Sequence, residues 1–216
     1  MTLICGIDEA GRGPVIGPMI MSGVLVDSKD LPKLKSMGVK DSKLLTREQR
    51  EELFDKILKI VKKYKIIIVE PKEIDEALES DDLNLNWLEA HKSAEIIDKL
   101  KPDKAILDCP STNTKAYESY VRNILNKDTE LIVEHKADVK YIESAAASIL
   151  AKVTRDKEMD KIQKKYGNCG PGYPSNAVTQ KFLEENWEKY PEIFRKSWSS
   201  YKKHSMAKNQ KKLGDF

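Results

Sequence analysis

The chain has 216 residues, 34% of them charged, and its formal net charge at pH 7 is only +3. This length can bury a full core, so we expect one domain with a C-terminal extension, and the mild charge does not by itself indicate a nucleic-acid partner. No apolar run is long enough to span a membrane, and the first residues lack a basic region followed by an apolar segment, so we expect a soluble cytosolic (cytoplasmic) protein. The basic excess gathers near the C-terminus, at Arg195, Lys196, Lys202, Lys203, Lys208, Lys211 and Lys212.

Five short runs rich in aliphatic and β-branched residues predict strands. They are Leu3–Ile7, Met19–Val26, Ile66–Glu70, Lys104–Asp108 and Glu130–Glu134. Helices are predicted between them: from Thr46, which forms a capping-box pattern with Gln49, to Lys63, and over Lys72–Glu79, Leu83–Leu100, Thr114–Asn126 and Val139–Tyr166. The first strands follow one another closely and the last two alternate with helices, which favours a mixed α/β sheet, antiparallel at one side and parallel at the other.

A glycine- and proline-rich loop begins at Gly167 and separates the last part of the chain from the α/β pattern. Short helices are predicted after this loop, around Thr179–Tyr190 and Glu192–Ser200, and a polar tail follows. We therefore expect an α/β domain over residues 1–166, a helical extension over residues 167–204 and a flexible tail over residues 205–216.

Acidic residues stand at or just after the C-terminal ends of three predicted strands. Asp8 and Glu9 close the first apolar stretch, Asp108 ends the fourth strand, and Asp138 follows the fifth. Ligands of open α/β sheets bind beyond the carboxyl ends of the strands, so these acids converge if their strands are neighbours. Four carboxylates in one pocket repel one another unless divalent cations sit among them, and oxygen-only donors favour Mg²⁺ or Mn²⁺ over zinc. Hard cations held in this way are typical of phosphodiester cleavage.

Each of these acids also has a structural interpretation. Asp138 precedes the long predicted helix and would serve as its N-cap, and Asp108 precedes a Cys-Pro pair and would start a turn. Asp8 and Glu9 are harder to explain in this way, because burial and like-charge crowding both oppose ionisation of the pair. The convergence itself depends on strand adjacency, which spacing along the sequence does not establish.

A glycine loop, Gly11-Arg12-Gly13-Pro14-Val15-Ile16-Gly17, follows the acidic pair directly. Prolines and an apolar run lead from it into a strand and not into a helix, so a dinucleotide-binding fingerprint does not fit. Its structural interpretation is a tight turn between hairpin strands. Its functional interpretation is bare backbone that a sugar or phosphate approaches closely, with Arg12 as a phosphate contact.

Ordered blocks of this sequence resemble the ribonuclease HII family, the type 2 ribonucleases H. The most specific block is Asp8-Glu9-Ala10-Gly11-Arg12-Gly13-Pro14-Val15-Ile16-Gly17-Pro18. Later blocks are Lys40-Asp41-Ser42-Lys43, Leu107-Asp108, Lys136-Ala137-Asp138, the run from Ala145 to Asp156, and Gly170-Pro171-Gly172-Tyr173-Pro174-Ser175, which resembles the archaeal form of the family's tyrosine segment. The resemblance extends to about Trp198. It implies a ribonuclease H-like mixed five-stranded sheet flanked by helices, with a C-terminal helical extension that binds substrate.

The resemblance implies a metal-dependent endoribonuclease that cuts the RNA strand of an RNA–DNA hybrid. Asp8, Glu9, Asp108 and Asp138 match the four acids with which the family binds two ions, Mg²⁺ or Mn²⁺. One ion would activate the attacking water and the other would stabilise the leaving 3′-oxygen, which yields 5′-phosphate and 3′-hydroxyl ends. The cellular roles implied are ribonucleotide excision and RNA primer removal.

The resemblance also implies how the substrate is chosen. The family's glycine-arginine-glycine loop, here Gly11, Arg12 and Gly13, reads the ribose 2′-hydroxyl through backbone groups. The family's tyrosine, which stacks on the deoxyribose after the ribonucleotide, corresponds to Tyr173, with Tyr166 as the alternative position. Together these groups would select a 5′-RNA–DNA-3′ junction, including a single ribonucleotide embedded in duplex DNA.

The long predicted helix carries a polar stripe beside its apolar one. Its members Ser144, Ser148, Lys152 and Arg155 follow helical spacing. We expect Ser148, Lys152 and Arg155, together with Lys43, to bind substrate, the cations at its backbone phosphates, with a solvated helix face as the alternative. His135 is interpreted as a strand-end residue, with a role in metal or proton chemistry as the alternative.

The last seven residues, Gln210-Lys211-Lys212-Leu213-Gly214-Asp215-Phe216, follow the pattern Q-x-x-L-x-x-F. This pattern resembles the short motif by which replication proteins, archaeal members of this family among them, dock on the sliding clamp (PCNA). It carries one terminal aromatic residue where two are common. The implied clamp contacts are Gln210, Leu213 and Phe216, and the alternative is a disordered basic tail that attracts phosphate. The family further implies a monomer.

Three other functions compete with this interpretation. A phospho-acceptor receiver domain also ends its first strand in an acidic pair, but its accepting aspartate comes much sooner than Asp108 does here. A catalytically silent junction binder is disfavoured because all four candidate acids are present. Ribonuclease HIII is the nearest enzymatic rival, but we do not expect its additional N-terminal substrate-binding domain here, because the acidic pair and glycine loop begin at Asp8.

Overall fold

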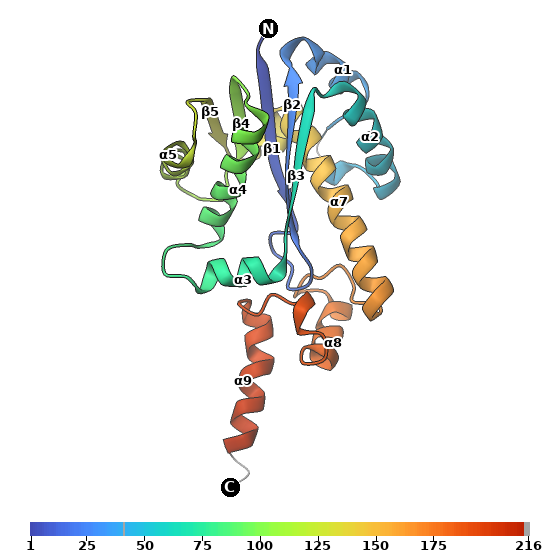
Figure 1. Ribbon diagram of the computed structural model, residues 1–216. Coiled ribbons are helices and arrows are strands. Elements are labelled where there is room, and N and C mark those ends of the chain that lie inside the picture. The colour runs from blue at the N-terminus through green and yellow to red at the C-terminus, as the bar shows by residue number, and fades with distance from the viewer. Residues whose placement is uncertain (41, 214–216) are drawn as a thin grey trace.

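A five-stranded mixed sheet forms the centre of the molecule (Figure 1). The computed structural model describes residues 1–40 and 42–213, with side chains up to Met206. The strands lie in the order β3-β2-β1-β4-β5, where β1 is Leu3–Ala10, β2 is Met19–Asp27, β3 is Lys63–Val69, β4 is Lys104–Asp108 and β5 is Glu130–Glu134. The β3, β2 and β1 strands pair antiparallel, and β1, β4 and β5 pair parallel. The predicted mixed sheet is therefore confirmed, with β1 as the strand where the two arrangements meet.

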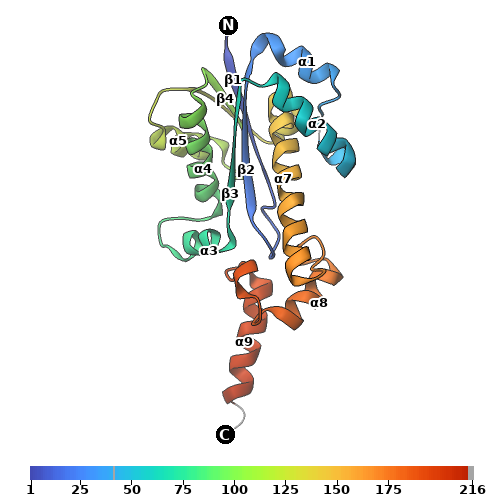
Figure 2. The ribbon, with the colours of Figure 1, turned by 45° about the vertical axis from the view of Figure 1, so that its right-hand side comes forward.

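Helices cover both faces of this sheet (Figure 2). One face carries α1 (Leu31–Ser36), α2 (Arg47–Ile60) and α7 (Ile142–Tyr166), and the other carries α3 (Pro71–Glu79), α4 (Leu85–Leu100) and α5 (Thr114–Ile124). Each layer has its own apolar core, which is the arrangement expected when both faces of a sheet are buried. The short α6 (Ala137–Lys140) leads into α7, and short 3-10 turns lie at Ser28–Asp30, Ser42–Leu44 and Pro191–Ile193.

The long helix α7 lies very close to β1 because both elements carry small residues at their contact. Ala145, Ala146 and Ala147 are almost fully buried in this layer. On the strand side stands Gly6, where an added Cβ would lie 2.2 Å from the backbone carbonyl carbon of Glu143. This close approach brings the polar residues of α7 to the end of β1 that bears the acidic pair.

The boundaries of α2 and β3 differ from their prediction. The capping box of α2 is confirmed by two hydrogen bonds. The Gln49 backbone N–H donates to Thr46 Oγ1 (3.3 Å), and the Thr46 backbone N–H donates to Gln49 Oε1 (2.9 Å). The helix nevertheless ends at Ile60, and β3 already begins at Lys63. The first residues of β3 are polar and exposed at the edge of the sheet, so their strand pairing with β2 leaves no apolar signal in the sequence.

The C-terminal part contains α8 (Ala177–Asn186) and α9 (Ser199–Leu213), which extend below the sheet (Figure 1). The predicted helix over Glu192–Ser200 is wrong, because only a 3-10 turn forms at its start and Phe194 then pairs with Ile16 in an isolated β-bridge. The α9 helix instead continues through much of the segment expected to be a polar tail.

A third apolar core joins the extension to the glycine loop. Its buried members are Val15, Ile16, Met159, Cys169, Phe182, Leu183, Ile193, Phe194 and Tyr201. The loop between β1 and β2 is therefore a packed structural segment and not the tight hairpin turn that was the structural interpretation. Among the described residues, no helix has the length and apolar character needed to cross a membrane.

The contact between Gly6 and α7 yields a test of the fold. We expect Gly6→Ala to lower the free energy of unfolding by about 3 kcal/mol, because the new methyl group meets helix backbone that cannot move aside. Gly38→Ala is the control: Gly38 has a φ of +87° but open space around it, so only conformational strain of about 1 kcal/mol is expected. Urea denaturation of both variants measures the difference, and equal losses would contradict the close approach.

Candidate active site

A pocket of about 410 Å³ opens at the C-terminal ends of β1 and β4. All four predicted acids line it: Asp8, Glu9, Asp108 and Asp138. Two of them meet because β1 and β4 are neighbouring parallel strands with Ile7 opposite Leu107, so the next residue of each strand is an aspartate at the same edge. The strand adjacency that the sequence left open is thus present, and the four acids share one pocket.

The acidic pair lies within β1 and not beyond it. The strand continues to Ala10, with Asp8 opposite Ser22 and Glu9 opposite Met21 on β2. Successive side chains of a strand point to opposite faces, so the two acids face different helical layers. Asp8 meets Ser148 of α7, whereas Glu9 lies near Glu89 of α4. The strand therefore brings both helical layers into the same site.

Asp138 enters the pocket from α6. It lies in the first turn of that helix, whose N-cap is Lys136, so the interpretation of Asp138 as the N-cap of the long helix is wrong. Its side chain is almost fully buried, and Asp138 Oδ2 lies 3.5 Å from Nζ of the exposed Lys43. Asp108 is held from the same segment, because the Ala137 amide nitrogen donates to Asp108 Oδ1 (3.2 Å).

Burial and mutual repulsion dominate the electrostatics of these acids. Burial, followed by the charge of Glu9, raises the pKa of Asp8 well above its usual value, while a hydrogen bond from Ser148 opposes the rise. Burial, followed by the charge of Glu89, raises the pKa of Glu9 to about 7. Burial also raises the pKa of Asp108 against the opposing hydrogen bond from Ala137. The protein alone therefore accommodates several negative charges here at a cost, which a bound cation would offset.

The donor set fits a hard divalent cation. Every acid that lines the pocket offers carboxylate oxygens, the ligands that Mg²⁺ and Mn²⁺ prefer. Within residues 1–40 and 42–213, however, no group of three or more acidic, histidine or cysteine side chains is close enough together to coordinate a metal ion. The pocket thus assembles the right chemistry, and tight coordination requires these carboxylates to move or other oxygen ligands to join them.

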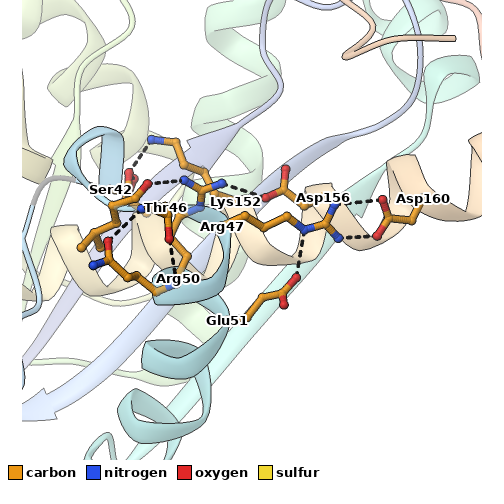
Figure 3. Close-up of polar contacts among 11 residues, drawn as sticks. Ser42, Thr46, Arg47, Arg50, Glu51, Lys152, Asp156 and Asp160 are labelled. Atoms are coloured by element: carbon orange, nitrogen blue, oxygen red, sulfur yellow. Dashed lines mark hydrogen bonds and ion pairs between the residues drawn. The ribbon is translucent and has the colours of Figure 1, made fainter. Parts of the chain in front are cut away.

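Ser42 links the loop before α2 to the acids. Ser42 Oγ and Ser148 Oγ lie 2.8 Å apart, and Lys152 Nζ donates to Ser42 Oγ (Figure 3). Because Ser148 also hydrogen-bonds Asp8, a continuous series of hydrogen bonds runs from Lys152 through Ser42 and Ser148 to Asp8. Lys43, Ser148 and Lys152, all predicted from the sequence, line the pocket or contact its lining in this way.

The α2 and α7 helices are also tied together by ion pairs beside the pocket (Figure 3). Arg50 Nη2 lies 3.0 Å from Asp156 Oδ2, and Arg47 pairs with Asp160 one turn further along α7. Arg50 and Asp156 both line the pocket. These pairs fix α2, and the turn before it that carries Lys43, relative to α7, which carries Lys152.

The Arg12 side chain has two protein partners on α4. Its Nε donates to Glu89 Oε1 (2.6 Å), and its Nη2 donates to Asn86 Oδ1 (2.7 Å). Glu89 is buried, which raises its pKa to about 7 against the lowering effect of Arg12. The phosphate contact of Arg12 stays a prediction, and the structure shows that α4 holds this guanidinium.

Arg155 is 5% exposed, so its interpretation as part of a solvated helix face is wrong. Its Nη1 donates to the Pro18 carbonyl oxygen (3.0 Å) and its Nη2 to that of Ile16 (3.3 Å). Gly11 has a φ of +78°, and a Cβ there would lie 2.2 Å from Arg155 Cδ, so only glycine fits above this side chain. The observed contacts of Arg155 support the glycine loop, and its phosphate contact stays a prediction.

Tyr173 stands at the pocket and Tyr166 does not. The Tyr173 side chain is 45% exposed and lines the pocket, and its Cε1 would lie 3.8 Å from a Cβ on Gly13. Tyr166 instead donates a hydrogen bond to Glu192 (2.8 Å) and packs on Tyr190. The neighbourhood of Gly13 thus favours Tyr173 as the tyrosine of the site.

Other predicted residues lie away from the pocket. His135 is exposed at the end of β5, where its Nδ1 lies 3.2 Å from the Cys109 carbonyl oxygen. Gln210 and Leu213 lie on α9, but their side chains and the whole of Phe216 are outside the described part of the chain. The clamp contacts therefore stay predictions.

Sequence reasoning missed two residues that surround the site. Glu89 occupies a buried position of α4, and nothing in the helical pattern distinguishes it from an ordinary surface acid. Arg195 was grouped with the basic residues of the C-terminus, but it is fully buried and donates to the carbonyl oxygens of Gly11, Arg12 and Gly17. Its place between two apolar residues and a tryptophan, Ile193-Phe194-Arg195-Lys196-Ser197-Trp198, is the signal that could have indicated burial.

Comparison with known proteins agrees with this arrangement. A sequence model described as Ribonuclease HII matches residues 5–201. Ribonuclease HII of Thermococcus sibiricus is 43% identical over 220 residues, which cover 98% of this chain and 96% of the relative. The crystal structure of ribonuclease H2 from Pyrococcus horikoshii OT3 superimposes with a TM-score of 0.87 at 42% identity, covering 95% of this chain and 98% of that one. The ribonuclease HII structure solved in complex with PCNA from Archaeoglobus fulgidus has a TM-score of 0.83 at 38% identity, covering 91% and 95% of the two chains. The chain therefore belongs to the ribonuclease HII family.

Proposed function

We propose that this protein is an endoribonuclease that hydrolyses the RNA strand of RNA–DNA hybrids and incises duplex DNA at embedded ribonucleotides. The observation that carries the proposal is that four acids from three separate segments line one pocket beside the glycine loop. Membership of the ribonuclease HII family supports the same reaction. Cleavage at 5′-RNA–DNA-3′ junctions, with 5′-phosphate and 3′-hydroxyl products, serves ribonucleotide excision and primer removal in this proposal.

Asp8, Glu9, Asp108 and Asp138 would hold two divalent ions, Mg²⁺ or Mn²⁺. Such ions supply Lewis-acid stabilisation of the charge that develops on phosphate during hydrolysis. The protein prepares the acids for metal binding, because Ser148 orients Asp8 and the Ala137 amide nitrogen orients Asp108. Lys43, beside Asp138, is placed to bind the phosphate next to the scissile bond.

The other walls of the pocket would select the substrate. Gly11, Arg12 and Gly13 present backbone to it, which would read the 2′-hydroxyl that distinguishes RNA from DNA. The exposed ring of Tyr173 stands next to Gly13 and would stack on the following deoxyribose. Lys152 would contribute to the phosphate-binding surface from α7, and Arg155 would act from beneath the loop.

We also propose that the C-terminal motif docks this enzyme on the sliding clamp and that the enzyme itself is a monomer. Its Q-x-x-L-x-x-F pattern and the solved PCNA complex of the Archaeoglobus fulgidus relative support the docking. The described part of α9 extends away from the sheet, which would place such a motif clear of the active site (Figure 1).

The buried acids of the proposed metal site predict how the free energy of unfolding depends on pH and on divalent cations. The raised pKa values of Asp8 and Glu9 mean that the folded state binds their protons more tightly than the unfolded state does. In EDTA, the free energy of unfolding should therefore fall by at least about 2 kcal/mol as pH rises from about 4.5 through 7. Saturating Mg²⁺ or Mn²⁺ at pH 8 should restore about 2–3 kcal/mol.

Thermal and urea denaturation across this pH range measure both effects. Glu9→Gln should flatten the pH dependence and reduce the stabilisation by cations, because it removes one titrating ligand. Glu118→Gln, at a half-buried acid on α5 that pairs with Arg122 far from the acidic cluster, is the matched control and should change neither. A stability curve for the wild-type protein that ignores both pH and divalent cations would count against the metal site.

The catalytic proposal is tested with two variants. Asp8→Asn or Asp108→Asn should reduce cleavage of a duplex containing one ribonucleotide by at least about a thousand-fold, because each change removes a charged metal ligand. Affinity for the duplex should stay within about threefold, since most of it comes from phosphate contacts. Asp128→Asn, at an almost fully exposed acid, is the control. Wild-type protein that leaves this duplex intact with Mg²⁺ and with Mn²⁺ would refute the assignment.

The clamp proposal is tested by changing the C-terminal motif. Replacing Leu213 and Phe216 together by alanine should weaken binding to the sliding clamp at least about tenfold, because these residues would be the apolar anchors. Replacing Lys211 and Lys212 by alanine should affect clamp binding less and would reveal a basic tail that merely attracts phosphate. Hydrolysis of a short duplex without the clamp should be unchanged in both variants. Titration calorimetry with the clamp provides the affinities.

A further inference from the structure

The C-terminal segment around residues 193–198 forms the floor of the glycine loop. Ile16 and Phe194 form an antiparallel bridge, and the Arg195 amide nitrogen donates to the Val15 carbonyl oxygen (2.9 Å). The Gly17 amide nitrogen donates to the Ile193 carbonyl oxygen (2.9 Å). The loop and this segment are thus paired through their backbones, although nearly the whole chain separates them in sequence.

The Arg195 side chain completes this floor. It is fully buried, and its three donor groups point to loop carbonyl oxygens: Nη2 to Gly11 (2.5 Å), Nη1 to Arg12 (2.7 Å) and Nε to Gly17 (3.0 Å). An arginine fork matches such a set of acceptors because its donors lie in one rigid plane. Burial lowers the pKa of Arg195, to about 9, so the group remains charged at neutral pH.

Trp198 extends the same arrangement by one residue. Its Nε1 donates to the Gly13 carbonyl oxygen (3.0 Å), and its ring lies 4.9 Å from the Arg195 guanidinium carbon. Arg195 and Trp198 therefore bind the carbonyl oxygens of Gly11, Arg12 and Gly13, each of which accepts a hydrogen bond from the extension.

Peptide geometry gives these contacts a consequence for the pocket. The C=O and N–H of one planar trans peptide point in opposite directions. Because the Gly11 and Arg12 carbonyl groups point to Arg195, the amide groups of Arg12 and Gly13 point away from the Arg195 guanidinium. The same three loop residues line the pocket, so this orientation presents N–H donors on the side where substrate would bind.

We propose that Arg195 and Trp198 are positioning residues that set the preference of the pocket for a ribonucleotide over a deoxyribonucleotide. This inference rests on the proposed function, because it concerns how the glycine loop would read a 2′-hydroxyl. Neither residue touches the substrate in this proposal. They act by fixing the direction of three successive peptide groups. The first two carry the Arg12 and Gly13 N–H donors, and the third, which ends at Pro14 and has no N–H, holds the end of the same turn.

The test measures preference separately from general affinity. In the full-length Asp8→Asn background, fluorescence anisotropy gives the dissociation constants for a DNA duplex with one ribonucleotide and for the same duplex made entirely of DNA. Arg195→Met should reduce the ratio of these constants about tenfold and leave the affinity for the all-DNA duplex unchanged. Hydrogen exchange of the Arg12 and Gly13 amides should become faster.

Trp198→Phe keeps the test decisive if Arg195→Met fails to fold, because it removes a single hydrogen bond and retains an aromatic ring beside Arg195. It should reduce the same ratio about threefold. The matched controls are Trp187→Phe, in the same extension, and Arg122→Met, on α5, and both should keep the wild-type ratio.

The outcomes separate this inference from the proposed function. Failure of the wild-type protein to cleave the ribonucleotide-containing duplex would overturn the function. If the wild-type protein cleaves it, but the Asp8→Asn protein shows no ribonucleotide preference or folded Arg195 and Trp198 variants retain it in full, the inference alone is overturned. Equal weakening for both duplexes would also overturn it, because that result indicates general loss of structure or charge.

Discussion

The candidate active site depends on an acidic pair that is buried in β1, the central strand of the sheet. Asp8 is 6% exposed and shares its pocket with Glu9 and Asp108, so each charge opposes ionisation of the others. This cost is tolerated because the sheet and helices supply opposing groups at the same edge: Ser148 from α7, the Ala137 amide nitrogen beside Asp108, and Lys43 beside Asp138. The small residues of the β1–α7 contact serve this arrangement, since they let α7 lie close enough for Ser148 to reach the acid.

The positively charged side chains around the pocket differ in their exposure and in the groups that they contact. Lys43 is exposed at the pocket, where its Nζ lies 3.5 Å from Asp138 Oδ2. Arg155 and Arg195 are instead buried and donate to backbone carbonyl oxygens of the glycine loop and the segment that follows it. Buried arginines satisfied by carbonyl oxygens fix backbone, whereas lysines at a rim attract phosphate with little geometric demand. The pocket thus separates the cations that would bind substrate from those that shape the loop.

Most of the sheet was predictable because its strands carry a local apolar signal. The meeting of Asp8 and Asp108 was inferred from a general rule about strand ends, and the parallel register of β1 and β4 supplies the adjacency that the inference required. The capping box at Thr46 was predictable because all its donors and acceptors lie within four residues. These features share one property: the residues that determine them are close in sequence or follow a topological rule.

The features that escaped prediction depend on contacts between distant segments. Arg195 and Lys196 are neighbours with the same charge, yet the first is fully buried and the second is exposed. Composition assigned both to a basic C-terminus, and only the carbonyl oxygens of the first loop distinguish them. Glu89 is similar, because the partner of its buried carboxylate is Arg12, which lies 77 residues earlier. Long-range satisfaction of buried charge leaves no periodic pattern in a sequence.

These long-range contacts also show what the C-terminal extension contributes to the pocket. A boundary near residue 166 follows the shift from helix to glycine-rich loop, but one apolar core crosses it and contains Val15 and Ile16 together with Phe194. Without the extension, those loop residues would lose their apolar cover, and the carbonyl oxygens of Gly11 and Arg12 would lose their donors. The sheet and the short helix α6 thus bring the four acids together, whereas the conformation of the loop beside them is completed by residues from the far end of the chain. The cluster of acids and the conformation of the loop beside it therefore depend on different parts of the polypeptide.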